Sequence, residues 1–202
     1  MGEINYDELL AFVLVAFALA GSPGPATLSL AATGAAFGFK AARNYLIGIM
    51  FGVVLVIIGV AGGVFAAISS IPHAADVMSV IATLYFGYLA YKIATAPPIG
   101  ELSSASDSPG FLTGFILNLS NPKAYAAFGA LFSQFQLIPA SPVQSSYFQV
   151  LVCFLVVSIV NPTWLLAGNA LRPLLQNEKT NRRVNLGFAV LLIMSVIFVV
   201  FL

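Results

Sequence analysis

Leu117-Asn118-Leu119-Ser120-Asn121-Pro122-Lys123 interrupts an apolar run, residues 111–138, that otherwise carries no charge. Pro122 has no N–H, so the carbonyl of Asn118 would lose its helical partner. Lys123 would lie roughly 18 Å along a helix from Phe111, near the middle of a bilayer core about 30 Å thick. A charge at that depth costs at least about 3 kcal/mol and usually faces a protein interior or a water-filled cavity. We therefore predict a functional site at residues 118–123.

The composition is that of a polytopic, all-α membrane protein. Of the 202 residues, 60% are hydrophobic and 7% charged, whereas soluble domains carry about 25% charged residues. One cysteine and one histidine provide no disulfide framework, no paired-thiol redox site and no cluster of metal ligands. An intramembrane enzyme would need a nucleophile–base or metal constellation. We therefore expect neither an enzyme nor a metal, cofactor or nucleic-acid partner.

A second interruption, Gly21-Ser22-Pro23-Gly24-Pro25, divides the apolar run at residues 9–39. The acidic residues Glu3, Asp7 and Glu8 argue against a signal peptide, which begins with a basic segment. The run is therefore predicted to be a retained first transmembrane helix. Its two prolines free backbone carbonyls, which is tolerated at membrane depth only where the backbone is buried in protein or lines a cavity. The alternative is a kinked helix without a ligand.

Six spans are expected in two sets of three. After the first, the expected spans are residues 45–68, 77–96, 111–138, 143–171 and 184–202, with a basic loop at 172–183. Residues 97–110 have the Pro, Gly and Ser content of a linker. They separate a first three-helix repeat, residues 1–96, from a second, residues 111–202.

The basic residues predict the orientation. If the first loop is cytoplasmic, every Lys and Arg except Lys123 lies on the cytoplasmic side, as does the linker. The positive-inside rule then places both termini outside the cytoplasm. The second repeat enters the membrane in the opposite sense from the first, so the Pro-broken first and fourth spans correspond. Paired interrupted helices near the midplane indicate the binding site of a secondary transporter.

Two other groups of residues have more than one interpretation. Gly48, Gly52, Gly59 and Gly63 share one face of the second span. This pattern predicts close packing against a helix of the same subunit or of a second subunit, and is compatible with a homodimer. Asp76 stands near the expected start of the third span. It is interpreted as an interfacial cap or as part of a proton relay.

The chain resembles one known family in motif order over essentially its whole length. The motifs are Pro23-Gly24-Pro25, then Gly34, Gly38, Gly48 and Gly52, then residues 84–92, then Phe111-Leu112-Thr113-Gly114-Phe115 leading to Asn121-Pro122-Lys123-Ala124. They are similar to those of the LysE/RhtB family of bacterial amino-acid exporters. The resemblance implies export of amino acids or close derivatives across the bacterial inner membrane, driven by the proton gradient. It does not identify the amino acid.

One position departs from the family pattern. Many relatives carry an acidic residue where Val53 follows Gly52, and here no Asp or Glu lies inside any predicted span. The candidates for proton coupling are therefore Lys123, Asp76 or the substrate itself.

An amino-acid substrate presents a carboxylate and an ammonium group, and broken helices offer partners for both. N–H groups at the start of a half-helix can bind the carboxylate, and carbonyls at the end of the preceding half can bind the ammonium. Lys123 would be the counter-charge of the carboxylate or a group that releases a proton. The alternative is that Lys123 snorkels or pairs with backbone carbonyls and only holds the broken helix. The candidate substrate-binding residues are Ser22, Pro23, Gly24, Pro25, Thr27, Asn118, Asn121, Pro122, Lys123, Asn161 and Trp164.

A second class of function remains open at this point. A membrane interaction or regulatory protein could keep the transporter fold without transport. It would share the lipid bilayer as its environment and could also bind ligands, so a flux assay separates the two hypotheses. For Asn161 and Trp164, a simple kink with a packed indole is the alternative to a site role.

Overall fold

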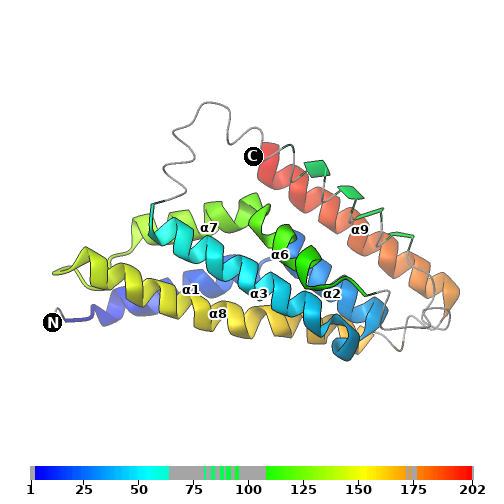
Figure 1. Ribbon diagram of the computed structural model, residues 1–202, viewed down its shortest axis with the longest axis horizontal. Coiled ribbons are helices and arrows are strands. Elements are labelled where there is room, and N and C mark those ends of the chain that lie inside the picture. Colours follow the sequence, from blue (N-terminus) through cyan, green and yellow to red (C-terminus); the bar gives the residue numbers. More distant parts are fainter. Residues whose placement is uncertain are drawn as a thin grey trace.

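The structure is a computed structural model that describes residues 3–63, 108–171 and 177–201, together with isolated residues at 80, 83–84, 87–88, 90–91, 94–95 and 173. In these ranges every element assigned is a helix (Figure 1). The helices are α1 (Tyr6–Gly21), α2 (Pro25–Phe37), α3 (Phe39–Ala61), α6 (Phe111–Leu119), α7 (Pro122–Gln134), α8 (Pro142–Leu171) and α9 (Glu178–Phe201). Asp76 and nearly all of the linker lie outside the described residues.

Two pairs of consecutive helices are separated by short non-helical segments that precede a proline. α1 ends at Gly21, α2 begins at Pro25, and the axes of the two helices are bent by 57°. α6 ends at Leu119 and α7 begins at Pro122. Proline suits the first position of a helix because the N–H it lacks would have no intrahelical acceptor there. Each pair therefore presents a helix C-terminus and a helix N-terminus close together.

The other helices start earlier than their apolar runs. α3 begins at Phe39, ahead of the span expected from Tyr45, so Lys40 and Arg43 stand exposed on its first turns. α9 begins at Glu178, so part of the segment expected to be a basic loop is helical. The side-chain oxygen of Asn177 accepts hydrogen bonds from the N–H groups of Lys179 and Thr180. This cap lets the helix start among charged residues.

Glycines bring the helices into close contact. A Cβ on Gly48 or Gly52 of α3 would collide with the backbone carbonyls of Phe111 and Phe115 on α6. Likewise a Cβ on Gly168 of α8 would collide with the carbonyl of Ala31 on α2. Of the two interpretations of the second-span glycines, Gly48 and Gly52 thus pack within the subunit. α3 contacts both α6 and α7, and α8 contacts both α1 and α2.

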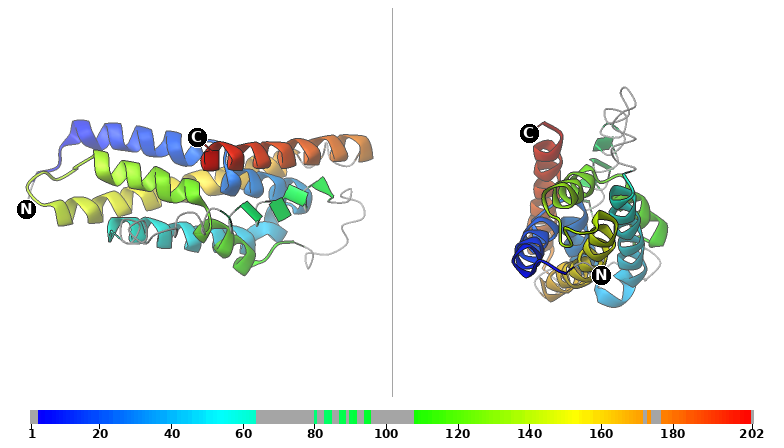
Figure 2. Two further views of the ribbon diagram at one scale, coloured as in Figure 1. Left: turned by 90° about the horizontal axis from the view of Figure 1, so that it is seen from above. Right: turned by 90° about the vertical axis from the view of Figure 1, so that its left-hand side faces the viewer.

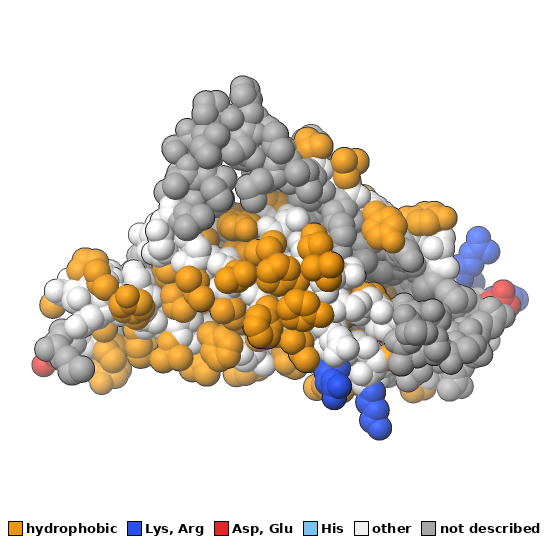
Figure 3. Space-filling model, viewed as in Figure 1, with side chains coloured by type: hydrophobic (Ala, Val, Ile, Leu, Met, Phe, Trp, Pro, Cys, Tyr) orange, Lys and Arg blue, Asp and Glu red, His pale blue; other side chains and the backbone are white. Residues whose placement is uncertain are grey.

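By length and composition, two described helices could cross a membrane, α3 and α8, or three spans exist if the bent pair α1 and α2 counts as one. Hydrophobic side chains cover the middle of the face seen in Figure 3. Lys and Arg side chains lie toward the end at which α3 and α9 begin, and the N-terminus lies at the opposite end of the long axis (Figures 1 and 2). The face seen in Figure 3 is therefore apolar in its middle and basic toward one end.

Candidate functional site

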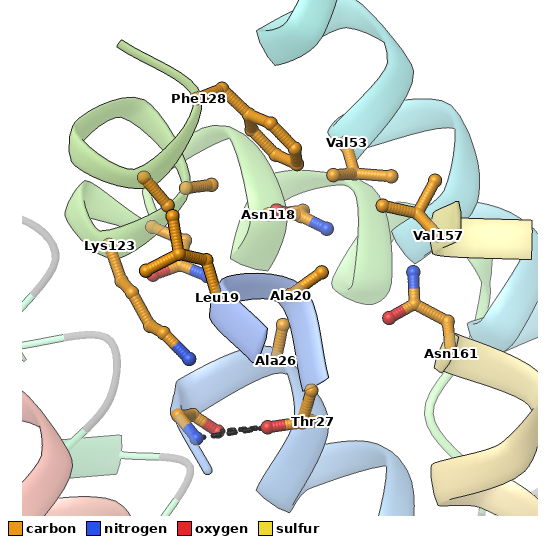
Figure 4. Close-up of a pocket in the computed structure, with 14 residues that line it drawn as sticks. Leu19, Ala20, Ala26, Thr27, Val53, Asn118, Lys123, Phe128, Val157 and Asn161 are labelled. Carbon is orange, nitrogen blue, oxygen red and sulfur yellow. Dashed lines mark hydrogen bonds between the residues drawn. The ribbon is translucent and has the colours of Figure 1, made fainter. Parts of the chain in front are cut away.

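A small cavity lies where the two helix breaks meet α3 and α8 (Figure 4). It offers about 50 Å³ to the centres of water-sized molecules, which corresponds to roughly four waters. Its lining residues are Leu19, Ala20, Gly24, Ala26, Thr27, Val53, Asn118, Asn121, Lys123, Ala124, Ala127, Phe128, Val157 and Asn161. One of these residues is cationic and none is a carboxylate. The cavity therefore combines a single positive charge with amide groups and an apolar wall.

Lys123 connects the two helix breaks. It lies on the first turn of α7, and its Nζ donates to the carbonyl of Ser22 at 2.7 Å and to that of Pro23 at 3.4 Å. A cation is disfavoured at the N-terminus of its own helix, but the C-terminal end of α1 carries the opposite partial charge. A Cβ on Gly24 would lie 2.7 Å from Cδ and 2.8 Å from Nζ of Lys123. Glycine at this position therefore makes room for the lysine side chain.

The break between α1 and α2 is held by its own hydroxyl groups. The Thr27 hydroxyl accepts the N–H of Gly24 at 2.9 Å and lies 3.1 Å from the carbonyl of Gly24. The Ser22 hydroxyl donates to the carbonyl of Leu19 at 2.8 Å. The N–H of Ala26, in the first turn of α2, has no acceptor within its own helix. The start of α2 therefore adds an N–H donor to the same break whose carbonyls bind Lys123.

Asn118 and Asn121 flank the break between α6 and α7 and are buried, with 2% and 4% of their surface exposed. The side-chain Nδ2 of Asn118 donates to the carbonyl of Ile49 on α3 at 3.1 Å. The Oδ1 atoms of both asparagines have no hydrogen-bond partner among the described residues. Asn121 is the N-cap of α7, yet its side chain makes no capping bond. Two residues that line the cavity thus each carry a buried acceptor without a partner in the described part of the chain.

α8 contributes two of the predicted residues in different ways. Asn161 lines the cavity opposite Lys123, and its Nδ2 lies 3.4 Å from the sulfur of Met50 (Figure 4). Trp164 is not among the lining residues. Its indole Nε1 donates to the carbonyl of Gly21 at 3.2 Å, so it holds the C-terminal end of α1 against α8.

The predicted site residues therefore divide into three groups. Gly24, Thr27, Asn118, Asn121, Lys123 and Asn161 line the cavity. Ser22 and Pro23 supply carbonyls to Lys123, and Trp164 supports the same break. Pro25 and Pro122 begin α2 and α7. Asp76, the other candidate for proton coupling, lies outside the described residues.

Sequence reasoning missed the apolar wall of the cavity. Val53, Phe128 and Val157 close one side of it in Figure 4. An apolar residue in an apolar helix gives no signal of its own. Val53 alone had been singled out, as the place where an acidic residue is absent.

Comparisons with known proteins agree with this description. The family profile described as LysE type translocator matches residues 17–201. The cysteine/O-acetylserine efflux protein of Salmonella typhimurium (strain LT2) is 27% identical over 186 residues, which cover 92% of this chain and 93% of that protein. The protein of the same name from Salmonella choleraesuis (strain SC-B67) gives the same values.

No solved structure matches the chain significantly. The profile match includes both helix breaks and every residue that lines the cavity. The resemblance seen in the motifs is confirmed. The chain belongs to the LysE type translocator family, whose members are membrane transporters and not enzymes.

Proposed function

We propose that this protein exports amino acids with small, uncharged side chains across the bacterial inner membrane. The observation that carries the proposal is the cavity at the two helix breaks. There one cation, the N-terminal end of α2 and amide oxygens without a partner among the described residues surround a space of small volume. A zwitterion needs partners of both signs, and this arrangement supplies them without a carboxylate.

The substrate's carboxylate would bind beside Lys123. A carboxylate paired with an ammonium group forms a charge-assisted hydrogen bond, and the start of α2 adds the N–H of Ala26 and a favourable dipole. Lys123 now donates to the carbonyl of Ser22, so an entering carboxylate would share or replace that partner.

The substrate's side chain would face the apolar wall. Val53, Phe128 and Val157 leave no partner for a charged group there, and burying an unpaired charge is costly. Two relatives are named as efflux proteins for cysteine and O-acetylserine, whose side chains are small and uncharged. Small, uncharged side chains agree with the small volume and the apolar wall of the cavity.

The proposal includes six spans in two inverted repeats, residues 1–96 and 111–202, joined by a cytoplasmic linker at 97–110. The pattern of contacts supports it. The unbroken helix α3 packs against the broken pair α6 and α7, and the unbroken helix α8 packs against the broken pair α1 and α2. An inverted repeat predicts this reciprocal arrangement. A homodimer would have to use a surface other than Gly48 and Gly52, which are occupied by α6.

Export would be coupled to protons moving inward. Among the described cavity residues no carboxylate is available as a carrier, and Lys123 is the one titratable side chain. We assign Lys123 the role of counter-charge, because it is the one cation among the described residues that line the cavity, and an ammonium group pairs strongly with a carboxylate. The proton path would then include groups outside the cavity or the substrate itself.

The test is amino-acid uptake into proteoliposomes with an acidic lumen, because protons that leave through an antiporter drive substrate inward. Alanine, serine, cysteine and O-acetylserine would be compared with lysine and glutamate, with pH-balanced vesicles and Lys123→Ala as controls. We expect gradient-dependent uptake of the small uncharged substrates only, lost in Lys123→Ala. If folded protein transports nothing under either condition, the alternative of an interaction protein is favoured instead.

A further inference from the structure

Two polar atoms of the cavity are not explained by the packing of the protein. The Oδ1 atoms of Asn118 and Asn121 are buried and have no hydrogen-bond partner in the part of the chain that the structure describes. Leaving a buried acceptor unpaired costs about 1–3 kcal/mol, so nearly all such atoms in folded proteins are satisfied. Both residues line the same cavity, three positions apart along the chain. Two unpaired acceptors on residues that line one cavity indicate a ligand that brings donors.

The orientation of the Asn118 amide is fixed by its neighbour. Its Nδ2 donates to the carbonyl of Ile49 at 3.1 Å. The reverse orientation would place two acceptors, Oδ1 and that carbonyl, against each other. The amide must therefore turn its nitrogen toward α3 and keep its oxygen free.

The side chain of Asn121 does not make the capping hydrogen bond that is usual at the N-cap of a helix. An N-cap asparagine normally accepts the N–H of the second or third helical residue, which stabilises the helix by about 1 kcal/mol. Asn121 has no such bond although it stands at the N-cap of α7. Its oxygen is therefore available for another partner.

Lys123 does not need these two oxygens. Its ammonium donates to the carbonyls of Ser22 and Pro23, which belong to the break between α1 and α2. The two asparagines flank the other break, between α6 and α7. The cation of the protein and the free acceptors thus have separate places in one cavity.

We infer that Asn118 Oδ1 and Asn121 Oδ1 form a subsite for the primary ammonium group of the substrate, which is recognised by neutral amide oxygens and not by a carboxylate. This inference rests on the proposed function and assigns the second half of the zwitterion. Two of the three ammonium N–H donors would bind the two oxygens. Ligands that lack the ammonium would leave both acceptors unpaired and bind more weakly.

The experiment measures binding to the full-length protein in lipid nanodiscs, by thermal shift and by the emission of its single tryptophan, Trp164. Three related probes are used under reducing conditions. L-cysteine carries both charged groups, cysteamine lacks the carboxylate, and 3-mercaptopropanoate lacks the ammonium. The proteins compared are wild type, Asn121→Ala, Lys123→Met and Asn185→Ala. The last removes a buried asparagine of α9 that does not line the cavity.

We expect Asn121→Ala to fold, because its side chain caps no helix. It should weaken cysteine and cysteamine about tenfold or more, as expected for a lost bond to a charged group, and change 3-mercaptopropanoate less than about twofold. Lys123→Met should weaken cysteine and 3-mercaptopropanoate but spare cysteamine. Asn185→Ala should preserve the wild-type ranking of the three probes.

Equal weakening of all three probes in Asn121→Ala, or no change in any, would overturn the subsite. So would a folded wild-type protein that binds 3-mercaptopropanoate as tightly as cysteine, or that binds none of the three. Vesicle uptake separates the two proposals. Cysteine uptake without the selective loss in Asn121→Ala leaves the exporter intact and removes the subsite. Selective binding without gradient-driven uptake of any amino acid leaves the subsite intact and removes the exporter.

Discussion

Gly24 and Lys123 depend on each other at the scale of single residues. The lysine side chain occupies the space where a Cβ of residue 24 would stand, and from there it reaches the carbonyl of Ser22. The colliding atoms are the far end of a flexible side chain, so the fold can adapt to a larger residue at position 24. The hydrogen bond from Lys123 to Ser22 would then be lost.

The first prediction concerns Gly24→Ala. Its Cβ would displace Lys123 from the carbonyl of Ser22, and we expect gradient-driven uptake to fall by about tenfold, the scale of one lost charge-assisted bond. The thermal midpoint should change little. The control is Gly21→Ala, where a Cβ would meet nothing within 4 Å. Equal uptake by the two variants would show that the position of Lys123 does not matter.

The second prediction separates the two roles of Lys123. Arginine keeps the charge but does not deprotonate in proteins. If Lys123 is a counter-charge, Lys123→Arg should retain gradient-driven uptake while Lys123→Met loses it by about tenfold or more. The measurement is the uptake rate at a series of imposed pH gradients. Loss of gradient coupling in Lys123→Arg, with substrate binding preserved, would instead identify Lys123 as the proton carrier.

At the scale of elements, close helix pairs are set by backbone-to-backbone contacts. Gly168 of α8 faces the carbonyl of Ala31 on α2, and Gly48 of α3 faces that of Phe111 on α6. Backbone atoms cannot rotate out of the way as the end of a lysine can. A methyl group at either glycine must separate two helices.

The third prediction concerns Gly168, where an added Cβ would meet backbone atoms and not the end of a side chain. Gly168→Ala should lower the free energy of unfolding in detergent by roughly 1–3 kcal/mol or more, as overpacking does. Gly187→Ala on α9, where a Cβ meets nothing within 4 Å, should be neutral or slightly stabilising because alanine favours helices. Denaturant titration of both variants beside wild type makes the comparison. A stable Gly168→Ala would mean that α2 and α8 can move apart at little cost.

The sequence predicted the polar half of the candidate site better than the apolar half. Asn118, Asn121 and Lys123 stand out because polar groups and prolines are costly in a membrane helix. The partners of Lys123 could not be predicted, since Ser22 lies 101 positions away in the chain. Val157 and Phe128 could not be distinguished from other apolar residues. The helix against which Gly48 and Gly52 pack could not be predicted either, because the contact with α6 is seen only in three dimensions.

At the scale of the whole molecule, basic side chains gather at one end. Lys40 and Arg43 are exposed on the first turns of α3, and Lys179, Arg182 and Arg183 on those of α9. The N-terminus lies at the other end (Figure 1). Positive charge near the ends of spans favours the cytoplasmic side. Inversion of the repeats and the position of the termini stay predictions until the orientation is measured.

The fourth prediction concerns the orientation of the chain in the membrane. Cys153 is fully buried, so Cys153→Ala gives a background for single cysteines placed at Glu3 or at Arg43. In spheroplasts a membrane-impermeant maleimide should label the cysteine at position 3. It should label the cysteine at position 43 only after the membrane is permeabilised. The opposite pattern would invert the topology, and labelling of both in intact spheroplasts would contradict a span between them.

The reciprocal packing of α3 on α6 and of α8 on α2 has a consequence for biosynthesis. The ribosome delivers α2 and α3 to the bilayer before their main partners have been made. Until then Ala31 and Gly48 lack the contacts that they make with α8 and α6 in the complete protein. The closest helix contacts of the first half of the chain can therefore form only after the second half has been made, and a chain truncated before Phe111 would lack them.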